Sequence, residues 1–352
     1  MKKIVLITIT ILFPFCLLAQ KNPVNKSIDI YLCIGQSNMA GWSPILALDE
    51  GPFVNTLLLN GKDEWEVAVC DSQGLNKYAT VTNSQPSQKL GVSFGFAKKI
   101  ENETDHYIGI IANARGGTSI EWWQKGYQGD KDFDMYEEAV RRTKAALATN
   151  PRGRLKAILW HQGESDNSSP KKDRYMARLK KLVNDLRTDL DAPDVPFVAG
   201  EVGKWNNRGL GVNPVIRQIS DSIPNAYWVT SEGLTSMDLP KNNPHFDTYG
   251  IRALGGRYAD KIMEVVYKKP AGGVTFYNEA GFKGRSVMLK AGKYPASWLE
   301  KIGINPEEIV SAKLDKGYSA YFLLGKKNVH KLLKNEDGFN ISFDTVLIKY
   351  NP

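Results

Sequence analysis

Cysteine and histidine are both scarce in this chain. Its 352 residues include 3 Cys and 4 His, with no C-x-x-C or H-x-x-x-H spacing. A disulfide-dense fold, a four-thiolate zinc site and a catalytic zinc centre are therefore not expected, and we expect no cofactor. Cys33 and Cys70 are candidates for a disulfide in an oxidising compartment. Because Cys33 lies in an apolar run, a buried free thiol is the favoured interpretation.

Charge of one sign is not concentrated anywhere in the sequence. The 46 Lys+Arg and 38 Asp+Glu residues give a net charge of +8, without a long basic block or a nucleic-acid-binding motif. We therefore expect a solvated surface and no nucleic-acid partner. The 42% hydrophobic and 24% charged shares are typical of a folded globular protein.

Only the N-terminus carries a long apolar run. Two lysines precede the apolar residues 4–19, and this run ends with the small residue Ala19. The pattern predicts a secretory signal peptide over residues 1–20, a secreted or periplasmic location, and no membrane attachment after cleavage. The alternatives are an uncleaved anchor, for which the run is short, and lipidation of Cys16, which the bulky Phe15 before it disfavours.

Short apolar segments alternate with helix-like segments over most of the chain. The expected strands cover 28–34, 107–112, 155–160, 195–199 and 226–230. The expected helices cover 93–100, 135–148, 171–190, 214–223 and 251–267. This alternation predicts an α/β domain with a parallel sheet covered on both faces, whose chemistry lies at the carboxyl ends of the strands.

The pattern changes at residues 268–273, where the sequence KKPAGG indicates a linker. The residues that follow alternate with a period of two in several short segments separated by Gly, Asn and Pro. We therefore expect an α/β domain over residues 27–267 and a small all-β domain over residues 274–352.

Polar or glycine-rich motifs follow the first three expected strands, and a fourth precedes the last expected helix. They are GQSNMAG (35–41), NARGGTS (113–119), WHQGESD (160–166) and NNPHFD (242–247). Read alone, the serine of the first motif could be only a helix N-cap. Together the motifs bring a serine, a glycine pair, an amide with carboxylates and a histidine to one sheet edge. A serine hydrolase needs these groups as nucleophile, oxyanion donors, acid and base.

The sequences GQSNMAG, ARGGTSIEWW, WHQGESD and HFDTYGIRALGGRYA, in this order, resemble those of the SGNH-type esterases. The most similar branch is the sialate O-acetylesterase-like group, which includes the acetylxylan esterases of carbohydrate esterase family 6. The resemblance covers about residues 27–267. It implies a three-layer α/β/α sandwich with a parallel sheet, and metal-free removal of acetyl groups from carbohydrate.

The resemblance also implies roles for individual residues. Ser37 is expected to be the nucleophile and His245 the general base. The oxyanion hole is expected to consist of the backbone N–H groups of Ser37 and Gly117 and the side-chain amide of Gln162.

The acid of the catalytic triad is less well defined by the resemblance. Many relatives carry an Asp three residues before the histidine, where this chain has Asn242. Glu164 is therefore the expected acid, with Asp238 and then Asp247 as alternatives. On this hypothesis, Glu164→Gln lowers turnover by orders of magnitude, whereas Asn242→Ala has little effect.

Four further residues are candidates for substrate binding. Trp122 and Trp123 follow the glycine pair, where they could offer sugar-stacking faces or pack in the core. Arg115 could meet an acidic group of the substrate or support its loop, and Asn38 adjoins the nucleophile. His161 is expected to pack or to form hydrogen bonds near the site rather than to act as the base.

The all-β segment has a resemblance of its own. Its sequence VTFYNEAGFKGRSV (274–287) is similar to the Greek-key motif of βγ-crystallins. The later GINPEEIVSA (303–312) aligns loosely with their calcium loop, but Glu307 and Glu308 replace shorter residues and Ala312 replaces a serine. We therefore expect at most weak calcium binding here. Glycan binding, shaping of the catalytic cleft and added stability are alternative roles for this domain.

The sequence thus predicts a secreted serine esterase. It would remove O-acetyl groups from acetylxylan or a related acetylated polysaccharide through an acetyl-enzyme intermediate. One alternative is a sialate O-acetylesterase. The other is an inactive carbohydrate-binding protein on the same fold, which Asn242 favours and which the intact Ser37, His245 and Gln162 disfavour.

Overall fold

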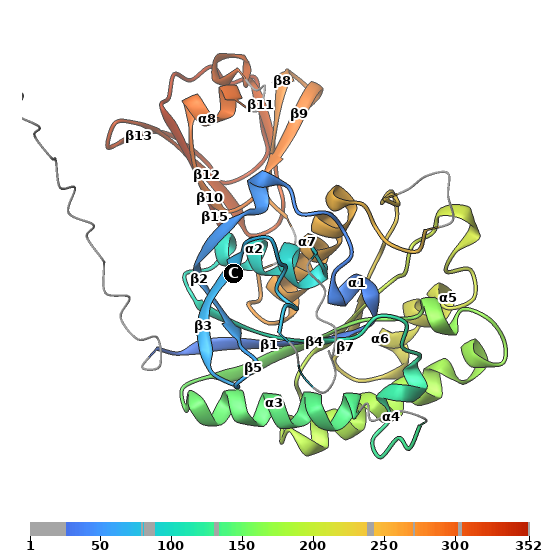
Figure 1. Cartoon of the computed structure of the whole chain (residues 1–352). Coiled ribbons are helices and arrows are strands. Elements are labelled where there is room, and N and C mark those ends of the chain that lie inside the picture. Colours follow the sequence, from blue (N-terminus) through green and yellow to red (C-terminus); the bar gives the residue numbers. More distant parts are fainter. Residues whose placement is uncertain are drawn as a thin grey trace, which may run out of the picture.

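The computed structural model (Figure 1) describes residues 26–78, 80, 89–129, 134–237, 243–269, 272–301 and 305–350. Several sequence-based predictions therefore lie outside the described residues: the signal peptide, Cys16, the alternative acid Asp238, and Asn242. Within the described part of the chain, no helix has the length and hydropathy needed to cross a membrane.

Seven strands form one sheet in the order β3-β2-β4-β1-β5-β6-β7. They are β1 (Ile28–Gly35), β2 (Gly51–Leu59), β3 (Trp65–Cys70), β4 (Tyr107–Ala114), β5 (Arg154–His161), β6 (Phe197–Gly200) and β7 (Ala226–Val229). All neighbours are parallel except β2 and β3. The central strand β1 is buried along its whole length, as its continuous apolar run predicts. The predicted parallel sheet is thus confirmed except at its edge, where β3 pairs antiparallel with β2.

Helices cover both faces of this sheet. They are α1 (Ser37–Ala40), α2 (Val92–Glu103), α3 (Met135–Thr149), α4 (Lys171–Asp189), α5 (Asn213–Arg217), α6 (Ile219–Ser222) and α7 (Thr248–Val265). Figure 1 shows α3 and α4 on one side of the sheet and α2 and α7 on the other. Alternate residues of β1 enter two separate cores, since Leu32 packs in the cluster that contains α3 and α4 and Tyr31 in the one that contains α2 and α7.

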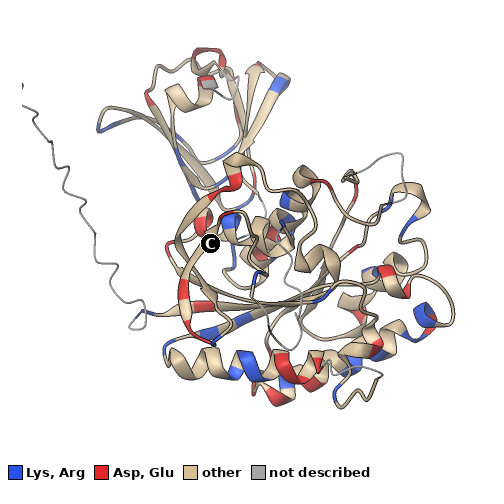
Figure 2. Ribbon diagram, in the orientation of Figure 1, with Lys and Arg blue, Asp and Glu red and all other residues tan. Residues whose placement is uncertain are grey.

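Five single-turn 3₁₀ helices lie in the loops that the structure describes. They are η2 (Ala47–Asp49), η3 (Ile120–Trp123), η4 (Glu164–Asp166), η5 (Trp205–Asn207) and η6 (Pro306–Glu308). Figure 2 shows basic and acidic segments mixed along α3 and α4, so charge of one sign is not gathered there.

Cys33 and Cys70 are both buried free thiols, which confirms the prediction for Cys33.

The C-terminal segment consists of two four-stranded antiparallel sheets, β10-β15-β12-β13 and β14-β11-β8-β9. The strands are β8 (Val274–Glu279), β9 (Lys283–Leu289), β10 (Gly292–Pro295), β11 (Ser311–Leu314), β12 (Tyr318–Leu324), β13 (Lys327–Leu332), β14 (Glu336–Asp337) and β15 (Thr345–Tyr350), with a short helix α8 (Ala296–Lys301). A separate core lies between the sheets, where Phe276 and Phe322 meet edge to face at 5.9 Å. The predicted change to antiparallel β structure is confirmed.

An ion-pair cluster joins the two parts of the chain. Lys290, which follows β9, bonds Asp260 of α7 and lies 3.5 Å from Glu103 of α2. Lys99 of α2 reaches the same Asp260 at 2.7 Å. The β segment is thus docked on the helices α2 and α7.

Candidate active site

Ser37 lies directly after the central strand, at the start of α1. The chain turns at Gly35, whose φ is +139° and where an added Cβ would lie 2.2 Å from the carbonyl oxygen of His161. Only glycine fits there, because the turn needs a positive φ and brings two backbones together. The N–H of Gln36 then donates to the same His161 carbonyl at 2.9 Å. This turn fixes Ser37 at the carboxyl edge of the sheet.

The glycine pair that follows β4 lies against Ser37. The N–H of Arg115 donates to the Gly35 carbonyl at 3.0 Å, so the loop begins beside the Ser37 turn. A Cβ on Gly116 would be 3.5 Å from the Ser37 Cβ. Gly117 follows with a φ of +76°, and both glycines are exposed. The predicted oxyanion donor Gly117 therefore lies in an accessible turn next to the predicted nucleophile.

Asn38 links Ser37 to the histidine loop. Its Nδ2 donates to Glu164 Oε1 at 2.6 Å and to the Pro244 carbonyl at 3.2 Å, and its Oδ1 accepts the Phe246 N–H at 3.3 Å. The side chain is 1% exposed. Asn38 is thus a buried structural residue, and the prediction that it contacts substrate is wrong for this geometry.

His245 lies between Pro244 and Phe246 and stacks on Trp42. The two rings are 4.6 Å apart and 3° from parallel. Trp42 is 44% exposed and also adjoins the glycine loop, since its Nε1 would be 3.8 Å from a Cβ on Gly116. Trp42 therefore connects the predicted base to the loop beside the predicted nucleophile.

The His245 imidazole is held in its neutral form. Burial, together with the positive charges of Arg208 and Lys89, lowers its pKa to about 4. Lys89 Nζ lies 5.3 Å from the centre of the Trp42 ring. A neutral imidazole is the form that can accept a proton from a serine hydroxyl.

Other loops anchor the backbone around His245. Trp205 Nε1 donates to the Asn243 carbonyl at 2.7 Å, and Ser43 Oγ donates to the Phe246 carbonyl at 2.6 Å. Trp42, Ser43 and Trp205 are not predictable from the sequence as site residues, because they lie in loops without a motif. An aromatic residue shortly after the nucleophile motif is the only sequence signal that points to Trp42.

Glu164 does not contact His245. Its side chain is 8% exposed, and burial raises the pKa of its carboxyl to about 7. The part of the chain that the structure describes contains a hydrogen bond from Asn38 to this carboxyl but no hydrogen bond or ion pair between Glu164 and His245. The predicted direct role of Glu164 in orienting His245 is therefore corrected, because the carboxyl is already bound to the Asn38 amide.

Asp247, the third candidate acid, has a structural role. It is the N-cap of α7, where its Oδ1 accepts the Gly250 N–H at 2.6 Å and its other oxygen accepts the hydroxyl of Thr235. Both oxygens of the Asp247 carboxylate therefore already accept hydrogen bonds, one of them at the start of α7.

His161 is fully buried, and its hydrogen bond defines its tautomer. The Tyr258 hydroxyl donates its one proton to the Trp160 carbonyl at 2.6 Å, so it can only accept from His161 Nδ1, 3.2 Å away. The other ring nitrogen, Nε2, then carries a lone pair and lies 3.9 Å from Glu164 Oε1. Burial lowers the His161 pKa to about 3. The prediction of a packed, hydrogen-bonded histidine is confirmed.

Gln162 connects three of the motifs. Its Nε2 lies 3.1 Å from Gln36 Oε1, 2.9 Å from the Thr118 carbonyl and 2.5 Å from Asp166 Oδ2. Two amide protons thus already face three acceptors, and the side chain is fully buried. The predicted oxyanion role of Gln162 does not fit this geometry. Asp166, whose pKa burial raises, also accepts the Ile120 N–H at 2.9 Å.

The two tryptophans after the glycine pair are placed differently. Trp123 is fully buried, donates from Nε1 to Thr118 Oγ1 at 3.1 Å, and packs perpendicular to Trp160 at 5.4 Å. The prediction of a stacking face is therefore wrong for Trp123, which is a core residue. Trp122 is half-buried and stacks with Tyr127 at 6.4 Å.

The surroundings of His245 are electropositive. Arg208 and Lys89 act on its pKa, and Arg115 begins the glycine loop, where burial lowers the guanidinium pKa.

Over the described ranges, no group of three or more His, Cys, Asp or Glu side chains is arranged to hold a metal ion.

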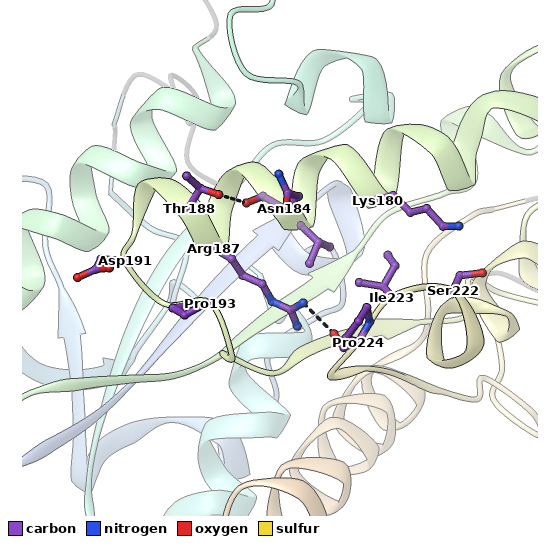
Figure 3. A pocket seen from close by; sticks show the side chains of 10 residues that line it. Lys180, Asn184, Arg187, Thr188, Asp191, Pro193, Ser222, Ile223 and Pro224 are labelled. Atoms are coloured by element: carbon purple, nitrogen blue, oxygen red, sulfur yellow. Dashed lines mark hydrogen bonds between the residues drawn. The ribbon is translucent and has the colours of Figure 1, made fainter.

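A cavity of about 610 Å³ lies elsewhere, beside α4 and the segment that precedes β7. Figure 3 shows Arg187 pointing toward Pro224 in this cavity. The guanidinium donates to the carbonyls of Val195, Pro224 and Asn225, so its donors are occupied within the protein. This cavity contains none of the motif residues.

Comparisons with known proteins place the α/β part of the chain in a family. The family model described as carbohydrate esterase, sialic acid-specific acetylesterase matches residues 27–264. A probable carbohydrate esterase of Arabidopsis thaliana is 30% identical over 245 residues, which are 64% of this chain and 87% of the relative. A probable 9-O-acetyl-N-acetylneuraminic acid deacetylase of Escherichia coli is 23% identical over 155 residues, 38% of this chain and 48% of the relative.

Two solved structures have the same fold in the α/β part. The X-ray structure of an Arabidopsis thaliana protein has a TM-score of 0.55 at 25% identity, covering 68% of this chain and 99% of that one. The crystal structure of NanS has a TM-score of 0.55 at 17% identity, covering 69% of this chain and 99% of that one. With the family model matching residues 27–264, the chain belongs to the carbohydrate esterase, sialic acid-specific acetylesterase family.

Proposed function

We propose that the protein is a serine esterase that removes O-acetyl groups from carbohydrate through an acetyl-enzyme intermediate. The observation that carries the proposal is the link between nucleophile and base. Asn38, the neighbour of Ser37, bonds the backbone on both sides of His245, whose imidazole is kept neutral. Family membership supports an esterase with an acetylated carbohydrate as substrate.

In the proposed reaction, Ser37 Oγ attacks the acetyl carbonyl carbon while His245 accepts the hydroxyl proton. The N–H groups of Ser37 and Gly117 stabilise the oxyanion, an effect worth about 10²–10³ in rate for one donor. Collapse of the tetrahedral intermediate releases the sugar hydroxyl, which takes its proton from His245. Water then attacks acetyl-Ser37 and gives a proton to His245, which passes it to Ser37 Oγ as acetate leaves.

Two carboxylates remain as candidates for assisting His245. Glu164 reaches His245 only through Asn38, so any contribution it makes is indirect. Asp238 remains the sequence-based candidate for a direct partner of the imidazole.

The charges around His245 favour an acidic sugar as substrate. Lys89 and Arg208, with Arg115 of the loop that begins beside the Ser37 turn, would attract the carboxylate of a sialic acid, whereas neutral xylan gains nothing from them. One relative is named as a deacetylase of 9-O-acetyl-N-acetylneuraminic acid, which supports the same choice. Acetylxylan or another neutral polysaccharide is the second candidate.

The finer architectural assignments also belong to this proposal. They are the three-layer α/β/α sandwich of SGNH-type hydrolases and a Greek-key domain of the βγ-crystallin type, with at most weak calcium binding. The lysines and apolar run at the N-terminus support secretion through a signal peptide over residues 1–20.

The test measures acetate release from 9-O-acetylated sialoside, acetylated xylan and acetylated mannan. Wild type is compared with Ser37→Ala and with Ser165→Ala, a matched control at the same sheet edge. We expect release from the sialoside above all, lost in Ser37→Ala and retained in Ser165→Ala. Equal release from wild type and Ser37→Ala would refute the proposed nucleophile, and release from xylan alone would refute the preference for acidic sugar.

A further inference from the structure

We propose that Asn38 is a positioning residue that holds His245 against Ser37, and that Glu164 serves the reaction only by fixing the Asn38 amide. This inference rests on the proposed roles of Ser37 and His245. It assigns the carboxylate of the HQGE motif a role through a neighbouring amide instead of direct contact with the base.

One amide group bonds both peptide units that flank His245. The Pro244 carbonyl belongs to the peptide unit before His245, and the Phe246 N–H belongs to the one after it. Asn38 donates to the first at 3.2 Å and accepts from the second at 3.3 Å. Because Asn38 directly follows Ser37 in α1, its side chain links the histidine backbone directly to the residue next to the proposed nucleophile.

The orientation of the amide is defined by its three partners. Nδ2 faces two acceptors, Glu164 Oε1 and the Pro244 carbonyl, and Oδ1 faces the Phe246 N–H. Rotation of the amide by 180° would set oxygen against oxygen at two contacts and N–H against N–H at the third. At 1% exposure, no bulk water competes for these groups.

Glu164 makes the shortest of the three bonds, at 2.6 Å. Its carboxyl is buried, with His161 Nε2 at 3.9 Å and its own Oε2 without a hydrogen-bond partner in the described part of the chain. Such a carboxyl is a fixed acceptor for the amide. The charged groups that act on His245 are instead the cations Arg208 and Lys89.

The opposite side of the histidine loop is held independently. Trp42 stacks on the imidazole and Ser43 Oγ bonds the Phe246 carbonyl. Loss of Asn38 would therefore loosen the His245 backbone without releasing the whole loop, which makes the effect measurable in a folded protein.

The experiment uses full-length protein in five forms: wild type, Asn38→Ala, Glu164→Ala, Glu164→Gln and the double Ala variant. Acetate release gives kcat and KM, and thermal unfolding verifies that each form is folded. We expect Asn38→Ala to lower kcat about 10²-fold, with KM nearly unchanged, because a small misplacement of a reacting group has costs of this order. Glu164→Ala should also lower kcat, and Glu164→Gln should recover most of that loss, because a glutamine oxygen can still accept from the amide.

The double variant separates indirect from direct action. If Glu164 works only through Asn38, the double variant is no slower than Asn38→Ala alone. Multiplied losses in the double variant, or a loss in Glu164→Gln as large as in Glu164→Ala, would overturn the inference.

A readout that needs no substrate keeps the inference distinct from the proposed function. NMR titration of the His245 imidazole is expected to give a pKa near 4 in wild type. In Asn38→Ala the pKa should move toward 6.5, because the loosened ring gains hydration. An unchanged His245 pKa in Asn38→Ala would overturn the positioning role of Asn38, even if the enzyme is active. If the His245 pKa changes in Asn38→Ala but the wild-type protein releases no acetate, the positioning role of Asn38 is supported and the proposed function is refuted.

Discussion

The acid limb of the pH profile is the prediction that depends most directly on the surroundings of His245. An esterase whose base is a histidine loses activity when the imidazole is protonated. Burial, with Arg208 and Lys89 nearby, lowers the pKa of His245 to about 4. We therefore expect kcat/KM to remain at its plateau down to about pH 5 and to fall only below it.

The size of the effect follows from the two protonation equilibria. At pH 5.5, an ordinary histidine with a pKa of about 6.5 is roughly 10% neutral, whereas one with a pKa of about 4 is roughly 97% neutral. The shift therefore predicts a rate at pH 5.5 about ten times higher than an unperturbed histidine would allow.

The assay is kcat/KM for acetate release between pH 3.5 and 8, on a neutral acetyl ester so that the substrate itself does not titrate. Arg208→Gln and Lys89→Gln should each move the limb upward part of the way toward 6.5, because burial remains as the larger cause. Lys62→Gln, an exposed cation in the turn between β2 and β3, is the matched control and should leave the limb unchanged. The carboxyl of Glu164, whose pKa is about 7, also changes its protonation state between pH 3.5 and 8. A wild-type limb near 6.5, unmoved in both cation variants, would refute the reasoning.

Three further predictions test the surrounding structure. Gly35→Ala should abolish activity and soluble expression, because the new Cβ would lie 2.2 Å from the His161 carbonyl oxygen; an active, stable variant would contradict the turn geometry. Trp123→Ala should lower the free energy of unfolding in urea by about 3–5 kcal/mol, because it removes a fully buried side chain, and a change under 1 kcal/mol would contradict the core placement. Cys33 and Cys70 should resist a thiol reagent in the native state and react in guanidinium, since burial raises both thiol pKa values; rapid native labelling would argue against their burial.

Much of the fold was predictable from the sequence because local patterns carry it. The strand of residues 28–34 is apolar except for Asp29, and its position in the centre of the sheet explains why. The β2–β3 hairpin was missed for the opposite reason. It forms the edge of the sheet, β3 is only partly buried, and the pairing of β2 with β3 is interrupted, so neither strand has a clear periodic pattern.

The candidate site was predictable only at the level of its motifs. Because parallel strands end at one edge, the four motifs were expected to meet, and the bonds of Gln162 to Gln36 and Thr118 and of Asn38 to Phe246 show that they do. The hydrogen-bond partner of each side chain could not be predicted. An amide or a carboxylate can bond many different groups, and the sequence does not indicate which of them lies nearby. Asn38 proved to be bound to Glu164 and to two backbone groups, and Gln162 to Gln36, to Asp166 and to the Thr118 carbonyl.

The most direct test of the central claim, that Ser37 is a nucleophile activated by His245, is covalent labelling with a fluorophosphonate followed by peptide mapping. We expect a single label on Ser37 in wild type and in Ser165→Ala, and a labelling rate lowered by orders of magnitude in His245→Ala. Absence of the label in folded wild-type protein, or labelling that does not depend on His245, would contradict it.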